Sequence, residues 1–77
     1  MRVLLVEDEP MISMLLCDMV EMAGHEVAGE AGSVDRAMQM VEEVAADAAI
    51  VDLRLHNHDS YGVMQQLRNK GIPFAVA

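Results

Sequence analysis

The stretch VLLVEDEP, residues 3–10, decides the fold class of this chain. It joins four aliphatic residues, with a β-branched valine at each end, to the acids Glu7, Asp8 and Glu9. An unbroken aliphatic run that stops at charged residues is typical of a strand buried on both faces. Strands of this kind occur in parallel sheets that helices cover on both sides, so the stretch predicts an α/β fold.

The residues that follow Pro10 change from a strand pattern to a helical one. Pro10 is compatible with the first turn of a helix, and Gly24 readily takes the left-handed conformation in which helices end. Between them the apolar residues recur with helical spacing, which predicts one buried stripe: Ile12, Leu15, Leu16, Met19, Val20 and Ala23.

The alternation of strand and helix continues to the end of the chain. Residues 26–31 predict a more polar strand near an edge of the sheet, residues 48–53 (AAIVDL) another buried strand, and residues 72–77 a last one. Ser33 can cap a second helix, and a third is expected over residues 60–70, after the polar loop RLHNHD. The residues expected to face inward are Val34, Ala37, Met38, Val41 and Val44 or Ala45 in the second helix, and Val63, Met64 and Leu67 in the third. The order β-α-β-α-β-α-β predicts a doubly wound parallel sheet.

Size and composition allow one small domain over residues 1–77 and exclude several functions. The chain has 5 basic and 13 acidic residues, a net charge of −8, so direct binding of nucleic acid is excluded. The single cysteine, Cys17, rules out an intramolecular disulfide and fits a reducing compartment. Since no apolar stretch approaches the ~20 residues of a membrane span, we expect a cytoplasmic protein.

Three acids stand where strands end. Glu7 and Asp8 follow the first strand, and Asp52 lies at the end of the third. The carboxyl ends of parallel strands share one edge of a sheet, so neighbouring strands would bring the three carboxylates together. Like charges at close range raise each other's pKa, whereas Mg²⁺ removes the repulsion and prefers oxygen ligands. The alternative is that Glu7 and Asp8 are solvated loop acids that favour the N-terminus of the next helix. Asp52 is harder to explain in this way, because an acid in an aliphatic segment is costly without a partner.

The segments VLLVEDEP and AAIVDLRL together resemble the receiver domain of two-component response regulators. The resemblance covers the whole chain, which corresponds to about the first two-thirds of a receiver, and it implies a flavodoxin-like sheet of order 2-1-3-4-5. The chain would lack the last strand and helices. The apolar run at residues 72–77 also has no turn signal after it, so we expect an incomplete fold.

The resemblance also implies roles for four residues. Glu7 and Asp8 would hold Mg²⁺, and Asp52 would be both a metal ligand and the phosphoacceptor. The backbone carbonyl of Arg54 would be a further ligand. Asp52 would take a phosphoryl group from the phosphohistidine of a sensor histidine kinase or of a histidine phosphotransfer protein. The chain would then be a signalling phosphoprotein and not a turnover enzyme.

The chain departs from the family pattern around the loop at residues 54–59. His56 stands where receivers usually have Pro, and Asp59-Ser60 where they usually have Asp-Gly. If Ser60 needed positive φ, the cost would be about 1 kcal/mol. Otherwise the loop is rebuilt, with Asp59 or Ser60 as a helix cap. The switch Ser/Thr and the Lys of the family have no counterpart up to Ala77.

Two other functions remain open on the residues alone. The chain could be a receiver-like interaction or oligomerisation module without phosphotransfer. It could also be a Mg²⁺-dependent phosphohydrolase, although Glu7-Asp8-Glu9 does not supply the Asp motif of those enzymes. If the chain ends at Ala77, the last strand would be an unpaired edge beside a bare apolar face, which predicts a homo-oligomer.

The remaining reactive or polarisable side chains have simpler expectations. His56 and His58 are expected to be exposed loop residues and not metal ligands, and Cys17 an inert thiol. Of the eight methionines, those at core spacing are expected to pack inside: Met19, Met38 and Met64. Those off the helical stripe are expected to be free to contact a partner: Met11, Met14 and Met22.

Overall fold

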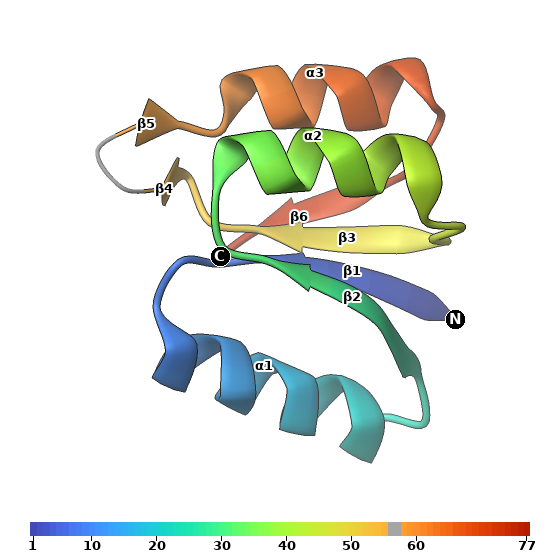
Figure 1. The fold of residues 1–77 in the computed structure, drawn as a ribbon. Helices are drawn as coiled ribbons and strands as arrows, with labels where there is room; N and C mark the ends of the chain where they lie inside the picture. Colours follow the sequence, from blue (N-terminus) through green and yellow to red (C-terminus); the bar gives the residue numbers. More distant parts are fainter. Residues whose placement is uncertain (56–57) are drawn as a thin grey trace.

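A computed structural model of the chain describes residues 1–55 and 58–77. A four-stranded sheet of order β2-β1-β3-β6, parallel throughout, lies between helices on both faces (Figure 1). The elements of this layered body are β1 (Arg2–Val6), α1 (Pro10–Met22), β2 (Glu26–Ala31), α2 (Val34–Glu43), β3 (Ala48–Val51), α3 (Tyr61–Asn69) and β6 (Phe74–Val76). The predicted α/β fold and the strand order implied by the resemblance are confirmed, with the polar strand β2 at one edge.

Local signals set the helix ends where the sequence predicts them. Pro10 is the first residue of α1, and the hydroxyl of Ser33 accepts a hydrogen bond from the Arg36 N–H at 3.2 Å at the start of α2. Gly24 and Gly71 follow α1 and α3 with φ of +85° and +72°. Only glycine takes this conformation readily, so both helices stop there.

Two described parts of the segment between β3 and α3 are strands, where a polar loop is predicted. Arg54–Leu55 (β4) and His58–Asp59 (β5) form a short antiparallel pair. Leu55 is fully buried in the core, and burial of this side chain favours the observed position of β4. His56 and Asn57 lie outside the described residues.

Helices α2 and α3 cover one face of the sheet and close the main core (Figure 1). The predicted inward residues of α3, namely Val63, Met64 and Leu67, are all buried. In α2 the buried residues are Ala37, Met40 and Val41, so Met40 joins the predicted stripe, while Val34, Met38 and Val44 are only partly buried.

Helix α1 lies on the opposite face, and its predicted stripe is only half buried (Figure 1). Val20 is buried and Leu16 packs beside it against β1. Ile12, Leu15 and Met19 are 46%, 60% and 64% exposed, so the prediction that they pack inside is wrong. The physical reason is coverage, because α1 is the one helix of the described chain on this face and packs mainly against β1 and β2.

Within residues 1–55 and 58–77, no helix is both long and apolar enough to cross a membrane.

Candidate functional site

The three acids singled out in the sequence meet at the carboxyl edge of the sheet. β1 runs directly into Glu7 and Asp8, and Asp52 is the first residue after β3. β1 and β3 are parallel neighbours, and the Asp52 N–H donates to the Val6 carbonyl at 2.8 Å. This pairing places Asp52 opposite the acids that follow Val6, and the predicted convergence is confirmed.

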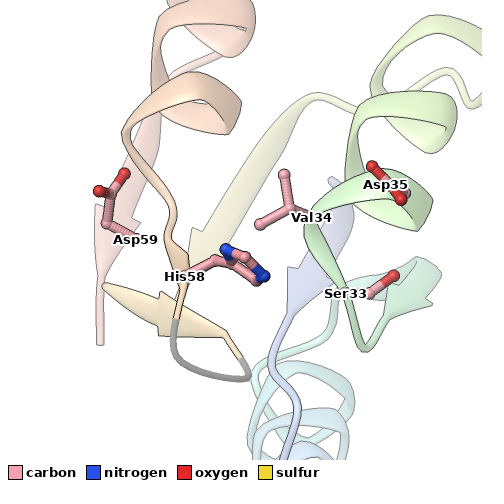
Figure 2. A pocket seen from close by; sticks show the side chains of 5 residues that line it. All are labelled: Ser33, Val34, Asp35, His58 and Asp59. Atoms are coloured by element: carbon pink, nitrogen blue, oxygen red, sulfur yellow. The ribbon is translucent and has the colours of Figure 1, made fainter.

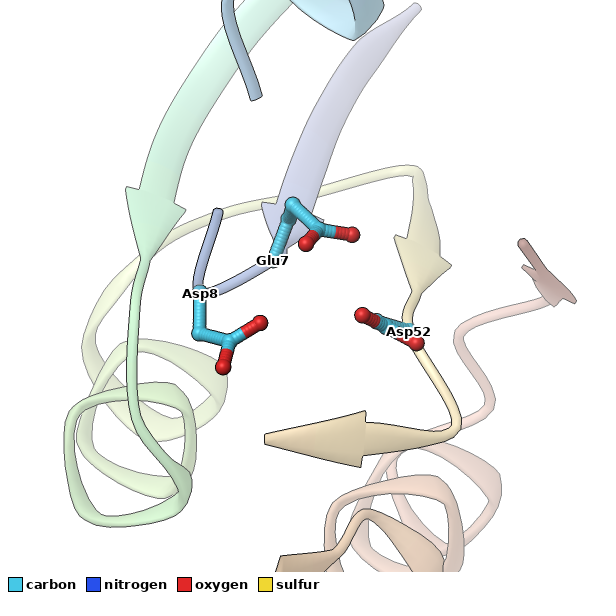
Figure 3. A group of neighbouring side chains, drawn as sticks. All are labelled: Glu7, Asp8 and Asp52. Carbon is cyan, nitrogen blue, oxygen red and sulfur yellow. The ribbon is translucent and has the colours of Figure 1, made fainter. Parts of the chain in front are cut away.

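The carboxylates form a compact cluster (Figure 3). One oxygen from each of Glu7, Asp8 and Asp52 lies within 4.8 Å of the other two. In the described part of the chain this is the one group of His, Cys, Asp or Glu side chains that could hold a metal ion. Glu7 is only 7% exposed, so the alternative that it is a solvated loop acid is wrong. Asp8 and Asp52 are half-buried and reachable from solvent.

Backbone N–H groups orient two of the carboxylates. Glu7 Oε1 accepts a hydrogen bond from the Glu9 N–H at 3.0 Å, and Asp52 Oδ1 accepts one from the Arg54 N–H at 3.3 Å. The Glu7 N–H in turn donates to the Ala31 carbonyl of β2 at 3.0 Å. The positions of Glu7 and Asp52 are therefore set by main-chain contacts as well as by their neighbours.

The electrostatics of the cluster favour a cation. Burial raises the pKa of Glu7 above its usual value, and the carboxylates of Asp52 and Asp8 raise it further. The hydrogen bond from the Glu9 backbone opposes the shift. A divalent cation would relieve both the burial of charge and the mutual repulsion, and oxygen ligands of this kind suit Mg²⁺. The residues present therefore fit a magnesium site.

The other predicted site residues fall around this cluster. Arg54 begins β4 with an exposed side chain, and its N–H contacts Asp52, whereas the role predicted for its carbonyl stays a prediction. Ser33, whose hydroxyl accepts a hydrogen bond from the Arg36 N–H at the start of α2, lines an open pocket (Figure 2). In Figure 2 the imidazole of His58 points across this pocket toward α2, with Asp35 and Asp59 at its two sides.

The Asp59-Ser60 departure has a structural explanation. Ser60 has φ of −101°, so the loop is rebuilt and needs no residue with positive φ. Asp59 Oδ1 accepts a hydrogen bond from the Tyr61 N–H at 3.2 Å at the start of α3. The hydroxyl of Ser60 makes no such cap and instead contacts the main chain at Asp52 and Leu53. Of the two caps predicted for α3, Asp59 is therefore confirmed and Ser60 is wrong.

Comparison with known proteins agrees with this geometry. Residues 3–76 match the response regulator receiver domain family. This chain belongs to that family. It is 34% identical over 71 residues to the transcriptional regulatory protein PdtaR of Mycobacterium tuberculosis, which covers 92% of the chain and 35% of that protein. It is 30% identical over 66 residues to the chemotaxis protein CheY of Thermotoga maritima, covering 86% of the chain and 55% of CheY.

Solved structures show the same receiver fold. The response regulator PhyR from Brucella abortus superimposes with a TM-score of 0.90 and 31% identity over 97% of this receiver chain and 32% of PhyR. The chain thus spans about a third of PdtaR and PhyR and about half of CheY, and it is shorter than a full receiver domain. Membership of the receiver family places the chain in two-component signalling.

Proposed function

We propose that this receiver domain accepts a phosphoryl group on Asp52 in a reaction that requires Mg²⁺. The observation that carries the proposal is the convergence of Glu7, Asp8 and Asp52 within 4.8 Å at the ends of β1 and β3. A fold gains no stability from three clustered carboxylates, so their placement is best explained by a bound cation.

The chain offers distinct positions for the metal and for the chemistry. Glu7, Asp8 and Asp52 would hold Mg²⁺ together with the Arg54 carbonyl, and the bound ion would neutralise charge on the transferring phosphoryl oxygens. Glu7 is buried and therefore shielded from a large phosphodonor, whereas Asp52 is half-buried at the surface of the same edge. This difference favours Asp52 over Glu7 as the nucleophile.

The reaction that we propose is one displacement at phosphorus. A carboxylate oxygen of Asp52 attacks the phosphohistidine of the donor, the new P–O bond forms, the P–N bond breaks, and the leaving imidazole takes up a proton. The product is an acyl phosphate on Asp52. The Arg54 N–H, 3.3 Å from Asp52 Oδ1, would help to orient the carboxylate during the attack.

The proposed partner is a sensor histidine kinase or a histidine phosphotransfer protein, in the cytoplasm. Receiver domains pair with histidine kinases, and the acidic surface argues against direct contact with nucleic acid. The domain would be a phosphoacceptor that assists its own phosphorylation and not a turnover enzyme.

A small acyl-phosphate donor with Mg²⁺ tests the proposal by intact mass measurement. We expect one phosphoryl adduct on the native chain and none on Asp52→Asn. Asp35→Asn, at the start of α2, removes a carboxylate outside the cluster and should leave the adduct unchanged. Peptide mapping that placed the phosphate on Asp59 would contradict the proposal.

The second candidate function is an interaction module without phosphotransfer. The observation that favours it is the row of exposed apolar residues on α1, including Leu15 and Met19. The same mass measurement separates the possibilities: no adduct favours the interaction module, and donor turnover without an adduct favours a phosphohydrolase.

A further inference from the structure

Ser60 is a polar residue with no exposed surface, placed between the phosphoacceptor and α3. Its Oγ lies 2.6 Å from the carbonyl oxygen of Asp52 and 3.0 Å from that of Leu53. Its N–H donates to the same Leu53 carbonyl at 2.9 Å. Its own carbonyl accepts from the Met64 N–H at 3.0 Å, the first helical bond of α3. One residue thus connects the end of β3 to the first turn of the helix.

The hydroxyl does more here than satisfy a buried group. A serine hydroxyl has one proton, and this proton is shared between the carbonyls of two adjacent residues that follow β3, Asp52 and Leu53. The hydroxyl oxygen accepts no capping hydrogen bond from α3. The Leu53 carbonyl has a second donor in the Ser60 N–H, whereas the contact to the Asp52 carbonyl depends on the side chain alone. Removal of the hydroxyl therefore acts mainly on Asp52.

The backbone of Asp52 is hydrogen-bonded at both its N–H and its carbonyl. Its N–H donates to Val6 of β1, and its carbonyl accepts from Ser60. The next side chain, Leu53, is 41% exposed and anchors the segment weakly. The backbone conformation fixes the direction of the Asp52 Cα–Cβ bond, so the Ser60 hydroxyl contributes, with the Arg54 N–H, to holding the carboxylate toward Glu7 and Asp8.

We propose that Ser60 is a positioning residue, which orients Asp52 for phosphorylation and couples occupancy of the acidic cluster to the first turn of α3. The inference rests on the proposed function and adds a specific residue to it. A displacement of the Asp52 backbone would be transmitted to Tyr61 and Met64 through the main chain of Ser60. A displacement of α3 would be transmitted to Asp52 by the same contacts.

The test compares Ser60→Ala with Ser60→Thr, which retains the hydroxyl, in the full 77-residue chain. The matched control is Ser13→Ala, since Ser13 is also buried but donates to Glu30 at 2.7 Å. The first measurement is the phosphorylation rate per folded molecule at saturating Mg²⁺ and donor. We expect Ser60→Ala to be slower by roughly 10-fold or more, because a small misplacement of a reacting group is costly. Ser60→Thr should recover most of the rate, and Ser13→Ala should lose stability but stay within about 2-fold of the native rate.

The second measurement is the amide NMR response of α3 to Mg²⁺, which is read without phosphorylation. Mg²⁺ should shift the amide signals of Tyr61 to Met64 in the native chain and in Ser60→Thr, and much less in Ser60→Ala. If the native chain binds Mg²⁺ but forms no adduct, the proposed function fails while the coupling is still decided by these shifts. If Ser60→Ala does not fold, Ser60→Cys replaces it as the variant with a weak donor. The inference is overturned if folded Ser60→Ala, or Ser60→Cys in its place, shows the native phosphorylation rate and the native amide response of α3 to Mg²⁺.

Discussion

Helices cover both faces of the sheet, but the two faces are buried to different extents. On one face α2 and α3 pack side by side and enclose the main core, which includes Leu4, Val6, Val51, Leu55 and Leu67. On the other, α1 alone packs over a small cluster of Val3, Leu5 and Val20. An apolar groove lies beside α1. The residues that line it include Met19, Ala23, Val3, Ile50 and Phe74.

The difference shows that an apolar stripe is buried only as far as its neighbours allow. A sheet face needs more than one helix to exclude water across several strands. The α2/α3 face therefore supplies most of the hydrophobic stabilisation, whereas the α1 face keeps apolar surface in contact with solvent. We expect substitutions on the two faces to differ in their effects on stability and on association.

The largest effect is expected for Leu67→Ala in α3. Leu67 is fully buried, and its loss would leave a cavity in the main core, lowering the free energy of unfolding by about 2–5 kcal/mol. Leu15→Ala in α1 makes the same chemical change at a residue that is 60% exposed, and should cost about 0.5 kcal/mol or less. Urea unfolding of both variants measures the contrast. Equal losses would show that the two faces do not differ in the way described.

Binding of Mg²⁺ to the acidic cluster should stabilise the folded chain. At a concentration of 100 times its dissociation constant, a ligand that binds only the folded state adds about 2.7 kcal/mol. Asp8→Asn should abolish most of the resulting rise in melting temperature, and Asp35→Asn should retain it. An unchanged response to Mg²⁺ in Asp8→Asn would argue against the metal assignment.

For the 77-residue chain by itself, the partly exposed α1 face predicts self-association, with a second copy of this chain as the occupant. The exposed groove between α1 and β6, next to the β6 edge, is the surface that association would cover. Met19→Glu adds a charge in the groove and should weaken association by roughly 10-fold, about 1.4 kcal/mol. Met22→Glu adds the same charge at an 87% exposed residue outside the groove lining and is the matched control.

Sedimentation of the native chain and both variants measures this association. Because the net charge of −8 opposes close approach, salt should strengthen the oligomer. A folded, cooperatively melting monomer at tens of micromolar would mean that the face covered by α1 is stable without a second copy of the chain.

The smallest effect is expected from an ion pair that joins α2 to α3. Glu42 accepts a hydrogen bond from Lys70 at 2.8 Å and another from Gln66. The hydrogen bond and the positive charge of Lys70 lower the pKa of Glu42. Since the folded state binds this proton less tightly than the unfolded state, the contribution is present above the unfolded pKa and is lost as the pH falls through the lowered folded value.

The comparison of Glu42→Gln with the native chain isolates this pair. The variant should be slightly less stable at neutral pH, and the difference should vanish in acid, as followed by urea unfolding. Glu43→Gln, whose carboxylate accepts from Gln39 and not from a lysine, should show no such convergence. A pH-independent difference for Glu42→Gln would remove the ion pair as its cause.

The sequence by itself determined the features that depend on near neighbours in the chain. Pro10, Ser33, Gly24 and Gly71 act on their own helix ends, so their effects could be predicted without a tertiary structure. The convergence of the acids was also predictable, because residues that follow neighbouring parallel strands share one edge. That step needed the strand order, which came from the resemblance to receivers.

Only the tertiary structure decided features that depend on residues far apart in the sequence. The exposure of Ile12, Leu15 and Met19 depends on how many helices cover their face, which no helical periodicity reports. The buried Leu55 orders a segment that reads as a polar loop, and the Ser60 hydroxyl bonds to a carbonyl 8 positions earlier instead of capping its own helix. A pattern specifies which side of an element is apolar, whereas burial and hydrogen-bond partners are set by what the folded chain brings against that side.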